Sequence, residues 1–219
     1  MNLTEILAKR QSIRKFKDID VPNEDIEEIV RAAINAPSGE NLQNWHFAAI
    51  KDREAIRAIG DIVRTKSEKI VQELRGIDEK KAERYQKFYN HFTLFLTKAP
   101  VLLAIYSFEI IPPPCKEMKL IGTYEDLIED NFHLRNPGVQ GYGAALENCN
   151  LRAIDLGYGA CWITSANHAA PEIEDFLKER FGFEKEGCYL ATMMAIGVPD
   201  EGNKSPRKKT LEDIYTFLG

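Results

Sequence analysis

The sequence predicts one domain that combines α-helices with a small, buried β-sheet. Its 219 residues are 44% hydrophobic and 29% charged, a composition that is typical of a globular protein with a substantial core. Three runs over 101–106, 158–163 and 189–198 are apolar at nearly every position, which indicates strands buried on both faces. Amphipathic helical segments separate these runs. No linker or repeat divides the chain, so we expect residues 1–219 to form a single domain.

The N-terminal part of the chain is expected to form two helices and a strand. Residues 2–9 are sufficient for one or two helical turns. A second helix starts at Asn23, whose side chain can cap it, and Pro37 ends it. A loop rich in hydroxyl and amide groups follows and leads into a strand over 45–50.

Residues 53–98 are expected to form two long, charged helices with a break near Gly76. The stretch 64–67 after Gly60 resembles a phosphate-binding loop, but it lacks the second glycine and a preceding strand. We therefore reject a nucleotide triphosphate site there. An aromatic stripe belongs to the second helix and is expected in the core, although it could also cover a substrate. It contains Phe88, Tyr89, Phe92 and Phe95.

The remaining elements lie between the buried strands. A strong helix is predicted over 139–156, another over 171–181 and a last short one at Leu211. The segment 108–136 has little pattern and begins with a rigid, extended Pro112-Pro113-Pro114. We interpret this segment as a candidate lid or insertion.

Composition excludes several classes of function. The chain has 29 basic and 34 acidic residues, a net charge of −5, which argues against nucleic acid and against an anionic membrane surface as partners. No apolar run approaches the roughly 18 residues of a transmembrane helix, and no signal peptide is recognisable, so a cytoplasmic location is expected. The cysteines form no C-x-x-C pair, which argues against a metal site and a disulfide framework. Buried thiols are expected at Cys149 and Cys161.

Residues 9–16 contain the candidate binding residues that are clearest from sequence alone. Arg10, Ser12 and Arg14 alternate, so an extended backbone would place them on one face. Guanidinium groups bind oxyanions through paired donors, and such a face suits a phosphate next to a polar ring. A solvated basic turn explains this segment alone equally well. In the loop after Pro37, Asn41 and Gln43 could bind the edge of a heteroaromatic ring, whereas the loop alone favours an ordinary turn.

Four segments, in this order, resemble motifs of the flavin-dependent nitroreductase family. They are Arg10–Arg14 (R-x-S-x-[RK]), 37–45 (P-S-x-x-N-x-Q-P-W), 148–163 (helix, glycine and strand) and 195–199 with the basic tail. The resemblance implies an α+β fold with a mostly antiparallel central sheet flanked by helices. It also implies an intertwined homodimer with FMN bound at the interface.

The resemblance assigns cofactor-binding roles to twelve residues. Arg10, Gln11, Ser12 and Arg14 would hold the phosphate, the ribityl chain and the N1/O2 side of the ring. Pro37, Ser38, Asn41 and Gln43 would form the loop that reaches the flavin from the other subunit. Thr164 and Ser165 would place a backbone N–H opposite flavin N5, and Arg207 and Lys208 would close on the phosphate. A ring-contacting amide is expected from the second helix, at Asn90 or His91. Asn44 replaces the family's proline, so the loop is expected to be less rigid.

The resemblance implies an NADH- or NADPH-dependent flavoenzyme that reduces a nitroaromatic, a quinone or a similar small molecule. Hydride would enter and leave through flavin N5 by a ping-pong mechanism, with Arg14 stabilising reduced flavin. No side chain need be catalytic, and the histidines are expected to be structural or exposed. A dehydrogenase, a dehalogenase or a flavin-consuming enzyme of the same fold remains an alternative. Two further alternatives are a flavin storage or sensing module and an anion-binding scaffold without flavin.

Overall fold

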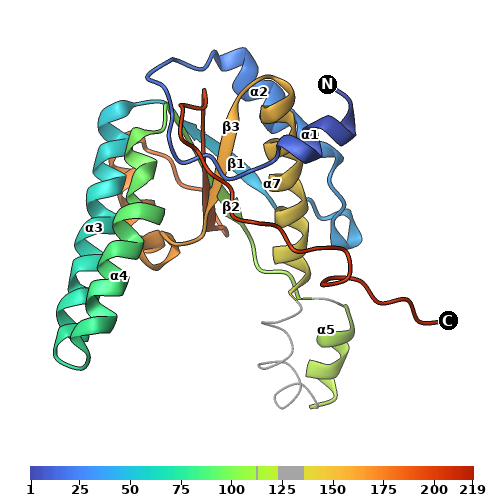
Figure 1. Ribbon diagram of the computed structural model, residues 1–219. Coiled ribbons are helices and arrows are strands. Elements are labelled where there is room, and N and C mark those ends of the chain that lie inside the picture. Colours follow the sequence, from blue (N-terminus) through green and yellow to red (C-terminus); the bar gives the residue numbers. More distant parts are fainter. Residues whose placement is uncertain (112, 123–135) are drawn as a thin grey trace.

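The computed structural model describes residues 1–111, 113–122 and 136–219. A four-stranded antiparallel sheet with the order β1-β2-β4-β3 forms its centre (Figure 1). The strands are β1 (His46–Ile50), β2 (Val101–Ser107), β3 (Gly159–Ile163) and β4 (Tyr189–Gly197). The predicted α+β fold with an antiparallel sheet is therefore confirmed.

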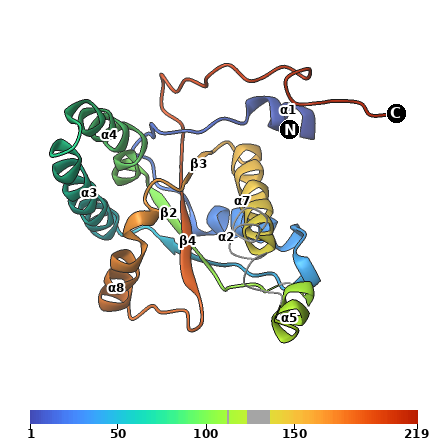
Figure 2. The ribbon, with the colours of Figure 1, turned by 90° about the horizontal axis from the view of Figure 1, so that it is seen from below.

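Helices cover both faces of the sheet, which explains why its central strands are apolar throughout. One layer contains α3 (Arg53–Arg75), α4 (Glu79–Phe92) and α8 (Ala170–Phe181). The opposite layer contains α2 (Asn23–Arg31) and α7 (Pro137–Asp155), as Figure 2 shows. Every residue of β2 is buried, because its side chains enter one apolar cluster or the other on alternate faces.

Short helical turns connect these elements. The N-terminal helix α1 (Leu3–Lys9) starts with a capping box, in which the side chains of Asn2 and Glu5 bond to each other's backbone N–H. Four 3-10 turns occur in the described chain. They are η1 (Ala32–Asn35), η2 (Gly39–Asn41), η3 (Leu94–Lys98) and η4 (Asn167–Ala169).

Three local predictions are wrong. Asn23 does not cap α2: it is the first residue of that helix, and its Oδ1 accepts a hydrogen bond from Lys51 Nζ at 3.1 Å. Residues 113 and 114 are not extended, because they open α5 (Pro113–Leu120), where a proline loses no helical hydrogen bond. Leu211 starts only a turn, because residues 210–219 are exposed among the described residues and a short isolated helix is unstable.

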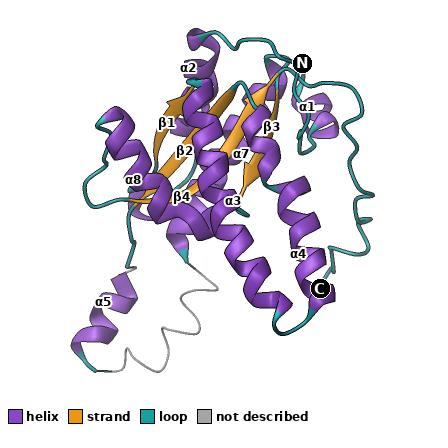
Figure 3. Ribbon diagram, turned by 90° about the vertical axis from the view of Figure 1, so that its left-hand side faces the viewer, coloured by secondary structure: helices purple, strands orange, loops and turns teal. Residues whose placement is uncertain are grey.

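The segment 108–136 is described in part. Helix α5 projects away from the sheet and its helical layers (Figure 3). Residues 112 and 123–135, which belong to the predicted lid or insertion, lie outside the described residues. None of the helices that the structure describes is long and apolar enough to cross a membrane.

The segment 10–16 runs along the outer edge of β3. Ser12 forms a parallel bridge with Ala160, and the Ile13 N–H donates to the Ala160 carbonyl at 3.0 Å. Phe16 pairs with Pro199 just beyond the end of β4. The edge of β3 is thus covered, whereas β1 pairs only with β2 among the described residues.

Candidate functional site

Two parts of the chain that are far apart in sequence hold residues 10–16 in place. Arg10 is the C-cap of α1, and its N–H still donates to the Ile6 carbonyl at 3.0 Å. Further along, Asn203 Oδ1 accepts from the backbone N–H groups of Arg14 and Lys15 at 3.0 and 3.1 Å. The fully extended part of this segment therefore begins after Arg10.

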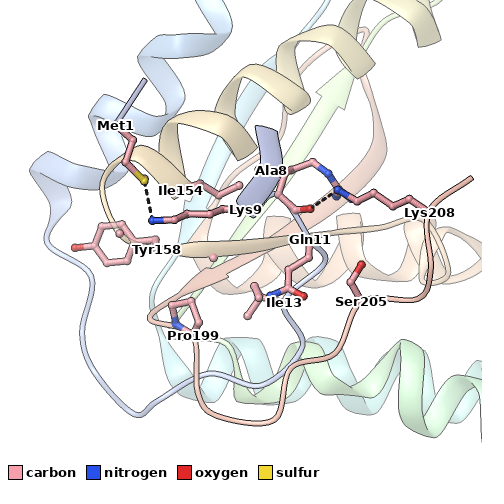
Figure 4. A pocket seen from close by; sticks show the side chains of 13 residues that line it. Met1, Ala8, Lys9, Gln11, Ile13, Ile154, Tyr158, Pro199, Ser205 and Lys208 are labelled. Atoms are coloured by element: carbon pink, nitrogen blue, oxygen red, sulfur yellow. Dashed lines mark hydrogen bonds between the residues drawn. The ribbon is translucent and has the colours of Figure 1, made fainter. Parts of the chain in front are cut away.

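A cavity of about 490 Å³ lies on one side of the segment (Figure 4). Arg10, Gln11 and Ile13 contribute to its wall, together with Lys208 from the C-terminal tail. Lys208 Nζ donates to the backbone carbonyl of Arg10 at 3.4 Å, so two residues of the sequence-predicted set line this cavity. Arg207 is exposed and makes no hydrogen bond or ion pair with the described residues.

A second cavity, of about 740 Å³, is lined by Ser12 and Arg14. Asn90 and His91, the two candidates for a ring contact, line the same cavity. Arg10 lines the first cavity, whereas Ser12 and Arg14 line the second, so their common face stays a prediction.

Arg14 is held over two aromatic rings at the wall of the second cavity. Its Cζ lies 5.1 Å from the centroid of the Phe92 ring and 5.9 Å from that of Phe95. Its Nε is buried and has no hydrogen-bond partner among the described residues. A buried donor without an acceptor is costly, so this atom indicates that a ligand or water supplies an acceptor here.

The aromatic stripe of the second helix divides between two roles. Tyr89 and Phe95 are buried in the core, whereas Phe88 and Phe92 are 44% and 42% exposed. Phe92 is the last residue of α4, and the chain leaves the α-helix at Thr93. The helix therefore ends earlier than predicted, and its last turn presents Phe92 to Arg14.

The turn after β3 contains Thr164 and Ser165 and is fixed by side-chain hydrogen bonds. Thr93 Oγ1 donates to Ser165 Oγ at 2.7 Å, and Ser165 Oγ donates to the Phe92 carbonyl at 3.5 Å. His168 Nδ1 lies 3.1 Å from the Ser165 carbonyl, and Ser67 Oγ lies 3.1 Å from His168 Nε2. His168 therefore links Ser67 to the Ser165 backbone and supports this turn.

The loop 37–43 lies away from both cavities and against α7. Ser38 Oγ accepts from the Gln43 N–H at 2.9 Å, and Gln43 Nε2 donates to Asn41 Oδ1 at 3.2 Å. Pro37, Asn41 and Gln43 are exposed. A single chain therefore does not bring these residues to Ser12 and Arg14.

Several cavity residues were not found from the sequence. Arg64, Lys98 and Lys204 line the second cavity, where the packing of α3 against η3 brings Arg64 and Lys98 together. They are far apart in sequence and carry no shared motif. The spacing of the motif residues 10–14 offered no signal for them.

Burial opposes ionisation of the two buried cysteine thiols. Burial raises the pKa of Cys149 to about 12. Burial also raises the pKa of Cys161, although the charges of Arg14 and Arg10 and a hydrogen bond with Ser12 act in the opposite direction. The expectation of buried thiols at both positions is confirmed. Among the described residues, no group of His, Cys, Asp and Glu is arranged to hold a metal ion.

Comparisons with known proteins agree with this architecture. A BluB-like flavoprotein of Clostridium difficile is 46% identical, with a TM-score of 0.96 over 100% of both chains. A nitroreductase of Bacteroides fragilis, solved with bound FMN, shares the fold at 20% identity, with a TM-score of 0.67 over 100% of both chains.

Curated relatives match over different lengths. Iodotyrosine deiodinase 1 of Rattus norvegicus is 31% identical over 98% of this chain and 68% of its own length. An Archaeoglobus fulgidus protein named for NADH dehydrogenase or NAD(P)H nitroreductase activity is 40% identical over 26% of this chain and 33% of its own. The model of the Nitroreductase family matches residues 7–198. Because this match covers most of the chain, the protein belongs to the nitroreductase family.

Proposed function

We propose that the protein is an FMN-dependent oxidoreductase that uses NADH or NADPH to reduce a small molecule such as a nitroaromatic or a quinone. The observation that carries this proposal is the unpartnered, buried Nε of Arg14 at the wall of the 740 Å³ cavity. An acceptor-rich ring edge would supply the missing partner. When bound, FMN would supply the hydride-transfer chemistry that links the reductant to the acceptor, and Ser12 and Arg14 would hold its ring.

The chain's own residues fit the two ends of FMN. Arg10 and Lys208 lie together at the first cavity, where two cations suit the dianionic phosphate. Arg207 is close in sequence and would add a third. Ser12 and Arg14 line the second cavity and would contact the ring, with Phe92 and Phe95 holding the guanidinium in place.

The proposed site would include residues of a second subunit. Pro37, Ser38, Asn41 and Gln43 lie outside both cavities, so their contact with flavin would come from another copy of the chain. Two features of the described chain support a homodimer: the outer edge of β1 is unpaired, and the C-terminal tail exposes large apolar side chains. Figures 1 and 2 show this tail running past α1 and away from the sheet.

The absorbance spectrum of the purified protein tests the proposal directly. We expect the visible bands of bound FMN, and we expect them to bleach under anaerobic conditions when NADH or NADPH is added. Return of the bands on addition of a nitroaromatic or a quinone would complete the two half-reactions. A protein that stays colourless after incubation with FMN contradicts the proposal. A coloured protein that neither nicotinamide bleaches would favour a flavin storage or sensing module.

Arg10→Ala is expected to raise the dissociation constant for FMN. A hydrogen bond between charged groups contributes about 1.5–3 kcal/mol, which corresponds to roughly a ten- to hundredfold change. Isothermal titration of the apoprotein with FMN measures it. Lys17→Ala removes the same charge from an exposed site outside the two cavities and serves as the control. Equal FMN affinity in the two variants would mean that Arg10 contributes only general surface charge.

A reductive dehalogenase is the second candidate. The observation that favours it is the match to iodotyrosine deiodinase 1, which extends over 98% of this chain. Such a reaction replaces a carbon–iodine bond with a carbon–hydrogen bond, consumes two electrons and one proton, and releases iodide. Incubation of the chemically reduced protein with iodotyrosine, followed by iodide determination, distinguishes it from a nitroreductase. Flavin reoxidation by nitroaromatics without iodide release would exclude this candidate.

A further inference from the structure

Asn44 is fully buried, although it follows an exposed loop. Its Nδ2 donates to Ser107 Oγ at 2.9 Å and to the Gly138 carbonyl at 3.0 Å. Ser107 is the last residue of β2, and Gly138 lies in the first turn of α7. One side-chain amide therefore ties the end of loop 37–43 to a strand and to a helix.

The loop that Asn44 ends has an unusual backbone. Glu40, Asn41 and Gln43 have positive φ angles of 53°, 54° and 45°, although none is glycine. Non-glycine residues keep such conformations only when surrounding contacts determine them. Within the loop, Ser38 Oγ accepts a hydrogen bond from the Gln43 N–H. At the end of the loop, the buried amide of Asn44 bonds to Ser107 of β2.

A proline at position 44 would not suit this loop. The residue before a proline avoids helical backbone angles, whereas Gln43 has a left-handed conformation. The expectation that the loop is less rigid without the proline stays a prediction, and the contacts of Asn44 show how the loop is held without it. In this chain, hydrogen bonds take the place of the proline ring as the means of fixing the loop.

Gly141 on α7 provides the space that Asn44 needs. A Cβ atom at this position would lie 2.8 Å from Asn44 Oδ1 and 3.5 Å from Ser38 Cβ. Asn44 Oδ1 has no hydrogen-bond partner among the described residues, so its position depends on packing against this helix face. The absence of a side chain at Gly141 allows loop and helix to approach.

We propose that Asn44 is a positioning residue that holds loop 37–43 in its left-handed conformation, with Gly141 as its complementary surface. The two Nδ2 hydrogen bonds fix Asn44, and the fixed Asn44 sets the direction in which Asn41 and Gln43 leave the surface. The consequence for the cofactor rests on the proposed function, because it requires the loop to contact FMN of the partner subunit.

The structural part of the proposal is tested without flavin, by hydrogen exchange and urea unfolding of the apoprotein. Asn44→Ala is expected to accelerate amide exchange in residues 38–43. Gly141→Ala is expected to do the same and to destabilise the protein, although alanine normally stabilises a helix relative to glycine. In an Asn44→Ala background, the clash between the new Cβ atom and Asn44 Oδ1 is absent. Gly141→Ala is then expected to be neutral or stabilising.

Gly143→Ala is the matched control on the same helix. Its Cβ would meet the nearest atom, Trp162 Cη2, at 3.4 Å, and it faces away from the loop. We expect unchanged exchange in residues 38–43. Unchanged exchange in Asn44→Ala, or additive effects of Asn44→Ala and Gly141→Ala on stability, would overturn the positioning role.

The link to the cofactor has a separate readout, the dissociation constant for FMN. We expect it to rise about tenfold in Asn44→Ala, by analogy with the roughly 10- to 100-fold effects of removing residues that support metal ligands. Ser107→Ala removes one of the two acceptors and should give a smaller increase. Faster loop exchange with unchanged FMN affinity would overturn the link to the cofactor and leave the spectroscopic test of the proposed function unaffected. A merely structural role would lower stability without changing the affinity of the folded protein.

Discussion

Arg14→Gln is expected to lower the midpoint potential of bound FMN by about 30 mV, which corresponds to about 1.4 kcal/mol for a two-electron couple. The guanidinium is fixed over Phe92 and Phe95 at the wall of the 740 Å³ cavity. A fixed cation near the ring favours the reduced cofactor, whose extra negative charge it stabilises. Glutamine keeps a hydrogen-bond donor and removes the charge.

The potential and the FMN affinity of this variant have to be measured on the same preparation. A lower potential with near-normal affinity supports a position at the ring. The opposite pattern, weak FMN binding with an unchanged potential, would place Arg14 at the phosphate and contradict the assignment. Lys17→Gln removes one exposed charge outside both cavities and controls for the overall charge of the protein.

Deletion of residues 204–219 is expected to dissociate the proposed homodimer and to release FMN. The large apolar side chains of this tail are 57–89% exposed. They are Leu211, Ile214, Tyr215, Phe217 and Leu218. Exposed apolar patches often mark protein–protein interfaces, so we expect another subunit to cover them. The shortened chain ends at Asn203. Its side chain therefore still accepts the hydrogen bonds from the backbone N–H groups of Arg14 and Lys15.

The deletion also removes Arg207 and Lys208, so a second variant is needed to separate the two roles of the tail. Ile214→Asp combined with Phe217→Asp keeps both cations and introduces charge into the apolar part. Multi-angle light scattering measures the mass of each variant, and absorbance measures its flavin. We expect monomers in both cases. A dimer that persists in both variants would show that the apolar tail does not hold the subunits together.

Local patterns in the sequence identified most elements of the fold. The continuous apolar runs at 101–106, 158–163 and 189–198 correspond to β2, β3 and β4, because strands covered on both faces need no polar side. The glycine-rich amphipathic stretch at 139–156 corresponds to α7. Predictions of helix ends were less accurate. Whether Asn23 caps a helix, and whether a helix forms at Leu211, depends on neighbouring segments that the sequence does not show.

The candidate site was likewise predicted in part from the sequence and in part only visible in the tertiary structure. The pattern 10–14 and its resemblance to a known family identified a basic binding segment. The tertiary structure alone showed that Arg10 lines one cavity and that Ser12 and Arg14 line another. It also placed Phe92 under the guanidinium of Arg14, through the end of α4 at that residue.

The sequence by itself determined the antiparallel α+β class, through its family motifs, and the positions of the buried strands. These properties depend on residue type and on spacing within one element. Only the tertiary structure decided which distant groups meet: the Asn203 side chain and the Arg14 backbone are 189 residues apart, and Asn44 bonds to groups 63 and 94 residues away. Such contacts depend on how packed layers bring chain segments together, and no periodicity within a single segment records them.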